Sequence, residues 1–313
     1  MNTGFWNSPN LRHDYTSKID SLNDWKEFIS KEKSITNLAK LIIKKSRISA
    51  DKIERINIGT NAVFDLGKYI LKIYAVNEKS HSAWKDCKRE IILSNILQSS
   101  PYQVPAIVKT GYIHDRYIVH YNIIEKINGL VPVSEILCKT NSLGYTLFLK
   151  ELHNIIHFFH SLNVNSNIAR MYSKPIKKYP KEQIEYTEYL HKYLHKNHSN
   201  YGIVHGDLTE FNIYFNEKNE IVILDFEDWM YAPSIVEYPT ICFELLKEPQ
   251  IISDFFENMS SSGAIEMLIA AILLHRESIR FLKMISLQID CNETLPSINE
   301  MRLFLLNWFP HRI

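Results

Sequence analysis

The hydrophobic pattern of this 313-residue chain changes its period along the sequence, which limits the folds that the chain can adopt. Branched or aromatic runs separated by Gly59 and Gly67 predict strands in the first part. These strands are expected at 53–58, 62–66, 69–74, 110–114 and 117–124. After Gly129 and Pro132 a helical period dominates. Helices are expected there at 143–162, 181–196, 234–247, 263–286 and 297–308. A strand-rich part followed by a helix-rich part predicts an α+β fold with two unequal lobes.

Approximate bounds can be given to the two lobes. We expect an N-terminal lobe over residues 1–127, with a helical extension over 20–48, and a C-terminal lobe over 128–313. Residues 1–20 are polar and are expected to form a loosely structured lead-in. Helices are also expected at 24–45 and 82–98, and short strands at 203–215, with a loop inside, and at 220–226.

Composition excludes several classes of protein. Lys and Arg number 36 and Asp and Glu 35, so a strongly basic nucleic-acid binder is not expected. The four cysteines lie far apart and lack metal-ligand spacing, which favours a reducing compartment without a disulfide framework. No apolar run approaches the ~18 residues that a membrane span needs, and residues 1–20 lack a signal-peptide core. We therefore expect a cytoplasmic protein with neither membrane nor nucleic-acid partners.

The residues with the clearest chemical pattern lie between 204 and 225. Asp207 and Asn212 are five apart, and Asp225 follows 13 residues after Asn212, directly behind the apolar run 221–224. In phosphoryl transfer a carboxylate orients the acceptor hydroxyl, while an Asn and a second Asp hold Mg²⁺ against the phosphates. The spacing fits Asp207 as the carboxylate that orients the hydroxyl, with Asn212 and Asp225 as the residues that hold the metal.

Two upstream residues fit the same chemistry. Lys72 lies inside the apolar strand 69–74, where an isolated cation is costly unless it is paired. Glu90 follows 18 residues later in the next helix. A strand lysine that contacts the phosphates and is held by a helix glutamate is typical of kinases.

Together these motifs resemble the aminoglycoside phosphotransferase and choline kinase branch of the protein-kinase-like superfamily, a branch of small-molecule kinases. The matching residues are Gly59 to Phe64, Tyr69 to Lys72, Glu90, His205-Gly206-Asp207 with Asn212, and Leu224 to Glu227. The resemblance spans about residues 53–230. It implies a bilobal fold with a small antiparallel-sheet N-terminal lobe and a larger helical C-terminal lobe.

The resemblance also implies a nucleotide site for ATP or GTP with Mg²⁺. Gly59 and Asn61 would lie in the loop over the phosphates, and Glu90 would orient Lys72. By the same resemblance Asp207 would be the catalytic base. The segment 121–129 would join the lobes, with the backbone of Glu125 and Ile127 meeting adenine.

The sequence also departs from related patterns. The loop after Ile58 has one glycine, Phe226-Glu227 replaces Phe-Gly after Asp225, and no Ala-Pro-Glu follows, which argues against a regulated protein kinase. The motif around Asp207 also resembles atypical RIO and Bud32-type protein kinases, but the 88 residues after Asp225 exceed what those compact enzymes usually carry. For the family's aspartate downstream of Pro233, Glu237 is the nearest candidate.

An uneven charge distribution points to the acceptor. Residues 226–313 carry a balance of −6, and the rest of the chain carries +7. This split suits an anionic nucleotide and a cationic acceptor. Acceptor contacts are expected from residues that directly follow Asp225, namely Glu227, Asp228, Trp229 and Tyr231. The alternative is that these are ordinary surface acids, with Trp229 in the core.

The resulting expectation is an ATP- or GTP-dependent phosphotransferase that acts on a hydroxyl of a small, cationic molecule. An aminoglycoside or related antibiotic is favoured, which would imply antibiotic resistance. A choline, ethanolamine or sugar kinase of the same fold is the first alternative, and a RIO- or Bud32-like protein kinase is the second. The sequence does not predict the oligomeric state.

Two histidine groups have a spacing that could bind zinc. His153, His157 and His160 share one helix face, but no carboxylate stands in a general-base position, so packing or hydrogen bonding is favoured. A second group at 191, 195 and 198 is expected at a solvated helix end.

Overall fold

The computed structural model describes residues 19, 21–56, 59–76, 82–138, 143–173, 179, 183–197, 200–289 and 295–309. Of the lead-in expected over residues 1–20, only Ile19 lies within the described residues. The chain divides into two compact units. The first comprises residues 1–130 and 216–228, and the second comprises 131–215 and 229–313. The boundary between the lobes, expected at residue 127, stays a prediction. Residues 216–228, which were expected in the C-terminal lobe, belong to the first unit.

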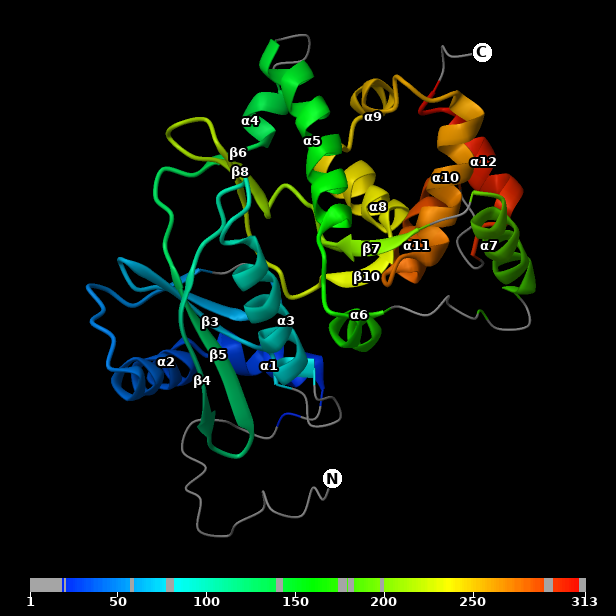
Figure 1. Ribbon diagram of the computed structural model, residues 1–313. Coiled ribbons are helices and arrows are strands. Elements are labelled where there is room, and N and C mark those ends of the chain that lie inside the picture. The colour runs from blue at the N-terminus through cyan, green and yellow to red at the C-terminus, as the bar shows by residue number, and fades with distance from the viewer. Residues whose placement is uncertain are drawn as a thin grey trace. The chain divides into compact units, whose positions relative to one another are not determined.

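The first unit is built on an antiparallel five-stranded sheet with the order β1-β2-β3-β5-β4 (Figure 1). Its strands are β1 (Glu54–Ile56), β2 (Ala62–Asp65), β3 (Tyr69–Ile73), β4 (Ile107–His114) and β5 (Ile118–Glu125). The predicted α+β fold with a small antiparallel-sheet lobe is confirmed.

The two faces of this sheet bury different side chains. Leu71 and Ile73 of β3 join the apolar core with α1 (Leu22–Ser30) and α2 (Glu32–Ser46). On the other face, Lys72 and the adjoining Tyr74 lie with α3 (Ser82–Leu97), because successive side chains of a strand point to opposite faces. The sheet therefore has one apolar face and one face that carries polar groups.

The helical pattern over 24–45 forms two helices instead of one. The chain breaks at Lys31, whose ψ of 85° is incompatible with a continuous helix, and its N–H caps α1 on the Phe28 carbonyl. The break lets Trp25 and Ile35 reach the same core.

A short strand ties residues 216–228 to the first unit. In β9 (Ile221–Ile223) the Ile221 carbonyl accepts from the Gln103 N–H, and the Ile223 N–H donates to the Gln103 carbonyl. This pairing holds the chain that leads to Asp225.

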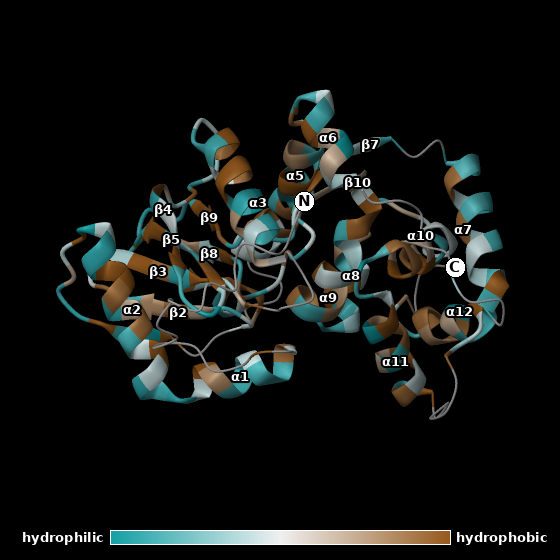
Figure 2. Cartoon of the chain, turned by 90° about the horizontal axis from the view of Figure 1, so that it is seen from below, coloured by the Kyte–Doolittle hydropathy of each residue, from teal (hydrophilic) through white to brown (hydrophobic). Residues whose placement is uncertain are grey.

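The second unit is mainly helical. Its helices are α4 (Ser134–Leu137), α5 (Leu143–Ser161), α6 (Ser166–Tyr172), α7 (Ile184–Lys196), α8 (Tyr238–Thr240), α9 (Pro249–Phe255), α10 (Ser261–Leu274), α11 (Ser278–Gln288) and α12 (Ile298–Leu306). Its strands are β6 (Val131–Pro132), β7 (Tyr201–Val204), β8 (Ile213–Phe215) and β10 (Met230–Pro233). Helix α10 is apolar on nearly all sides and buried, and it is drawn largely in brown in Figure 2. It forms the centre of this unit.

Helix α5 packs closely on β7, the strand that leads into the segment around Asp207. A Cβ at Gly202 would lie 2.4 Å from the His160 carbonyl oxygen, so only glycine permits this approach. The short pair β7–β10 thereby gains a rigid support.

Two expected helices are wrong in their extent. Residues 263–286 form α10 and α11, because the backbone becomes extended at His275. Residues 234–247 begin as a 3-10 helix, Ser234–Glu237, pass through α8 and end as a π-helix, Ile241–Leu246. Five short elements were not expected from the sequence, namely β6, α4, α6, α9 and β10.

No helix in the described residues is long and apolar enough to cross a membrane.

Candidate active site

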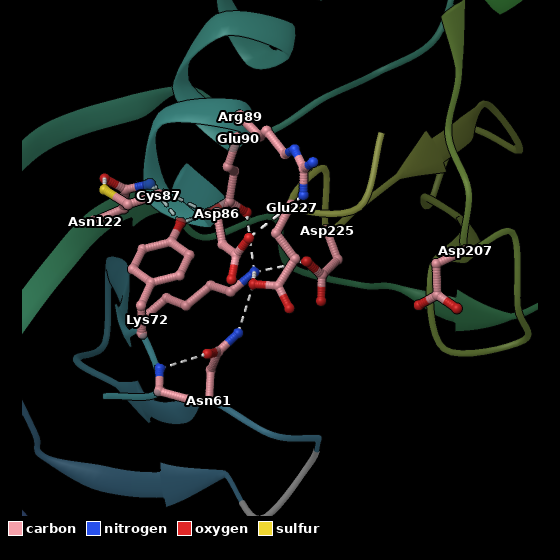
Figure 3. Close-up of polar contacts among 12 residues, drawn as sticks. Asn61, Lys72, Asp86, Cys87, Arg89, Glu90, Asn122, Asp207, Asp225 and Glu227 are labelled. Carbon is pink, nitrogen blue, oxygen red and sulfur yellow. Dashed lines mark hydrogen bonds and ion pairs between the residues drawn. The ribbon is translucent and has the colours of Figure 1, made fainter. Parts of the chain in front are cut away.

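A buried lysine surrounded by carboxylates is the main polar feature of the first unit. The ammonium of Lys72 lies 2.6 Å from Oδ1 of Asp225, 3.0 Å from Oε2 of Glu227 and 3.3 Å from Oε1 of Glu90 (Figure 3). The expected Lys72–Glu90 pair is therefore present. Glu227, expected at the acceptor, lies on this lysine as well.

The backbone at Asp225 takes an unusual conformation. Its φ of +64° is in the left-handed region, which costs free energy for any residue with a side chain, although aspartate tolerates it better than most. The residue stands two positions after β9, so the turn begins where the strand ends. Strain of this kind is often found at functional positions.

Asn61 fixes the position of Glu227. Its Nδ2 donates to Oε2 of Glu227 over 2.6 Å, and its Oδ1 accepts from the N–H of Ala75 over 3.0 Å. Asn61 was expected to contact the nucleotide, and that role stays a prediction. In this structure it ties the loop before β2 to the carboxylate on Lys72.

The charges in this cluster do not balance. Burial alone would lower the pKa of Lys72, but Asp225, Glu227 and Glu90 together raise it well above its usual value. Burial raises the pKa of Glu90, and it raises the pKa of Glu227 to about 8 against the opposing effect of Lys72. Three carboxylates around one ammonium are thus held together only at an electrostatic cost, which a further cation would relieve.

A magnesium ion fits this donor set. No group of three or more His, Cys, Asp or Glu side chains in the described residues forms a ready-made metal site. Magnesium, however, is usually bound through one or two carboxylates together with substrate phosphates and water. The excess negative charge around Asp225 meets that requirement.

The second unit holds Asp207 and Asn212 together. Nδ2 of Asn212 donates to both the carbonyl oxygen and Oδ2 of Asp207, each over 2.8 Å. The N–H of Thr209 donates to the same carbonyl over 2.9 Å. Because its amide nitrogen is used in this way, Asn212 keeps its amide oxygen as the group suited to a cation.

Glu237 anchors the start of this loop. Its buried carboxylate accepts from the backbone N–H of His205 and from that of Gly206, the latter over 3.0 Å. Burial raises the pKa of Glu237 to about 8, although the two N–H groups act in the opposite direction. Its correspondence to the family's aspartate stays a prediction.

Replacing Glu237 with glutamine should change how stability depends on pH. When the pKa of an acid is higher in the folded state than in the unfolded state, the fold loses stability as pH rises through that interval. For Glu237 the interval runs from the ordinary pKa of 4.5 to about 8. The E237Q variant lacks this titration, so its free energy of unfolding relative to the wild type should increase between pH 6 and pH 9. Urea denaturation at each pH measures this. The exposed Glu248 supplies the control E248Q, and parallel curves for E237Q and the wild type would contradict the burial argument.

Other expected nucleotide contacts lie in the first unit. Gly59 has a φ of +73° in the turn before β2. Glu125 ends β5, with its N–H donating to the Ala106 carbonyl over 2.8 Å, and Ile127 follows as a half-buried residue. The adenine contacts of Glu125 and Ile127 stay predictions.

The expected acceptor residues have different surroundings. Trp229 is 0% exposed and packs on Tyr172, with ring centroids 4.7 Å apart. Its ring is unavailable to an acceptor, so this part of the expectation is wrong and the alternative with Trp229 in the core is right. Asp228 and Tyr231 are half-buried, and their role at the acceptor stays a prediction.

The histidine groups do not form a metal site among the described residues. The ring of His153 stacks on Phe255, with centroids 4.1 Å apart, and its Nε2 lies 2.8 Å from the Phe255 carbonyl oxygen. His160 contacts the carbonyl of Asn200. His198 lies outside the described residues.

Tyr74 and Asn122 were not expected at the site. Both contact Glu90, and both are polar residues among apolar neighbours of the sheet. A polar side chain in an otherwise apolar strand was the signal that could have identified Asn122.

Comparison with known proteins places these observations in context. The sequence model of the phosphotransferase enzyme family matches residues 52–250. The comparison with curated proteins gave no match.

Solved structures share the fold. The GDP complex of wild-type aminoglycoside 2'-phosphotransferase-IIIa is 14% identical, with a TM-score of 0.58 over 88% of this chain and 99% of that one. ADP-bound aminoglycoside phosphotransferase APH(2'')-Ib is 16% identical, with a TM-score of 0.51 over 87% and 98%. Choline kinase LicA from Streptococcus pneumoniae is 13% identical, with a TM-score of 0.53 over 88% and 99%.

Proposed function

Because this chain belongs to the phosphotransferase enzyme family, we propose that it transfers the γ-phosphate of ATP or GTP to a hydroxyl of a small, cationic molecule. The observation that carries this proposal is the buried Lys72 held between Glu90 and Asp225. An ammonium in this position can bind the phosphates of a nucleotide, as the strand lysine of kinases does.

In the first unit, Lys72 binds phosphate oxygens while Glu90 keeps its ammonium in place. Asp225 and Asn212 are the residues proposed to hold Mg²⁺, which supplies positive charge to the phosphates when it is bound. Glu227 adds a further carboxylate beside Lys72 and so increases the excess of negative charge that a cation would relieve.

In the second unit, Asp207 orients the acceptor hydroxyl and accepts its proton at a carboxylate oxygen. Asn212 restrains this carboxylate through Oδ2, and Glu237 restrains the backbone that precedes it. Catalysis would then depend mainly on positioning and electrostatic stabilisation.

An aminoglycoside or related antibiotic is the acceptor class that we favour. The balance of −6 in residues 226–313 supports a polycation, and Asp228 and Tyr231 are the proposed contacts. One structural neighbour was solved with GDP and kanamycin. We place the activity in the cytoplasm, because the four scattered cysteines are typical of a reducing compartment.

A choline or ethanolamine kinase is the second candidate. The similarity to a choline kinase fold supports it, as does the half-buried aromatic ring of Tyr231, because an aromatic face can bind a quaternary ammonium. The same alternative includes a sugar kinase of this fold.

An acceptor screen tests the proposal. The full chain is incubated with Mg²⁺, with ATP or GTP, and with one acceptor: kanamycin, gentamicin, choline, ethanolamine, a simple sugar or a protein. The release of nucleoside diphosphate and the mass of the acceptor are both measured. We expect phosphorylation of an amine-bearing small molecule. Labelling of proteins alone would overturn the proposal in favour of a RIO- or Bud32-like kinase.

A further inference from the structure

A second layer of buried polar groups lies behind the Lys72–Glu90 pair. Tyr74, directly after β3, is 1% exposed, and Asn122, in the middle of β5, is 0% exposed. Nδ2 of Asn122 donates to Oη of Tyr74 over 2.6 Å and to Oε2 of Glu90 over 3.2 Å. The Tyr74 hydroxyl donates to the same Oε2. We name Tyr74 and Asn122 together the glutamate clamp.

The two oxygens of Glu90 therefore have different partners. Oε1 faces the ammonium of Lys72, whereas Oε2 accepts from both members of the clamp. Fixing one oxygen of a planar carboxylate with two donors restricts rotation of the group, and this determines where the other oxygen points.

The sheet explains why these groups meet. Lys72 and Asn122 are direct partners in the antiparallel register of β3 and β5, and Tyr74 follows Lys72 by two positions on the same face. Asn122 is itself held, since its Oδ1 accepts from the thiol of Cys87 on α3 over 3.4 Å. The donors come from the sheet and the acceptor from the helix, so the clamp also fixes α3 against the strands.

Lys72 needs such restraint on its glutamate. Its ammonium is nearer to Asp225, at 2.6 Å, than to Glu90, at 3.3 Å. If Glu90 turned away, Lys72 would keep two carboxylates, Asp225 and Glu227, and the ring of Tyr74, whose centroid lies 5.3 Å from the ammonium. The lysine would then neutralise Asp225, which we propose as a metal ligand, and would be less available to phosphate.

We propose that Tyr74 and Asn122 are positioning residues that act through Glu90 to hold Lys72 for nucleotide binding. This inference rests on the proposed function. Apolar side chains of similar size would fill the same space without the free-energy cost of burying a phenol and an amide, and here every donor of the clamp converges on one oxygen of Glu90.

The test compares two Tyr→Phe variants within one sheet. Y74F removes the hydroxyl that contacts Glu90. Y121F removes a similarly buried hydroxyl, 3% exposed as a residue, on the opposite face of β5, where it accepts from Ser46 Oγ over 2.9 Å. Binding of a non-hydrolysable ATP analogue with Mg²⁺ is measured by calorimetry. We expect Y74F to raise the dissociation constant about tenfold and Y121F to leave it within about twofold.

A double-mutant cycle identifies the route of the effect. If the clamp acts through Glu90, Y74F should cause no further weakening in the E90Q background. Weakening of equal size in both backgrounds, or none in Y74F alone, overturns the clamp while leaving the proposed function in place. Unchanged binding in E90Q itself would instead count against the proposed role of the Lys72–Glu90 pair. Should Y74F fail to fold, N122S tests the same inference through the second donor.

Discussion

Replacing Asp207 with asparagine should lower the turnover number by about 10³-fold, because the variant keeps the shape of the side chain and loses the carboxylate that we propose accepts the proton. The amide oxygen of asparagine can still accept the hydrogen bond that Asn212 now donates to Oδ2 of Asp207. The loop should therefore stay in place, and nucleotide affinity should change by less than about twofold. Steady-state kinetics with an acceptor found in the screen, together with calorimetry for the nucleotide, measure the two effects.

A matched change in the same unit serves as the control. Asp254 on α9 accepts from the hydroxyl of Tyr145 over 2.8 Å. Like D207N, D254N removes one charge by replacing a carboxylate oxygen with an amide nitrogen. We expect near wild-type turnover for D254N. Turnover of D207N within about threefold of the wild type would contradict the role of general base, and equal losses in both variants would indicate a structural effect.

Replacing Lys72 with methionine should lower the free energy of unfolding by about 3–5 kcal/mol at pH 9, since the change leaves buried carboxylates without their cation. The loss should shrink as pH falls. Without Lys72 the pKa of Glu227, already raised to about 8, would rise further, and a carboxyl whose folded pKa is raised destabilises the fold only where it must ionise. Urea denaturation at pH 9 and pH 6 measures the difference.

Lys109 on β4 provides the comparison for this variant. Its ammonium donates to the Ser46 carbonyl over 2.7 Å, so K109M removes a lysine of the same sheet from a neutral acceptor. Its effect on stability should be small and nearly independent of pH. A pH-independent loss in K72M would mean that packing of the lysine stem, rather than the carboxylates, sets the cost.

The spacing of residues in the sequence predicted those contacts of the site that form within one loop or between neighbouring elements. Lys72 in an apolar strand required a partner, and Glu90 on the following helix provides it. Asp207 and Asn212, five residues apart, are held together within one loop. In both cases a single element or two neighbouring elements decide the contact.

Contacts between distant segments could not be predicted in the same way. Glu227 meets Asn61, 166 positions earlier, and nothing in the spacing of either segment indicates that contact. Trp229 became a core residue because α6, an unexpected short helix, brings Tyr172 against its ring. Hydrophobic periodicity likewise could not place the break at Lys31, since both helices continue the same apolar pattern.

The return of residues 216–228 to the first unit affects how this protein could be recombined with its relatives. The chain passes between the units at 130/131, 215/216 and 228/229, so neither unit is a continuous cassette. A chimera joined once, after residue 130, would inherit Lys72 and Glu90 from one parent and Asp225 and Glu227 from the other. Shuffling that preserves the cluster must take both segments from the same parent. A single crossover achieves this only after residue 228, and it then transfers residues 131–215 of the second unit as well.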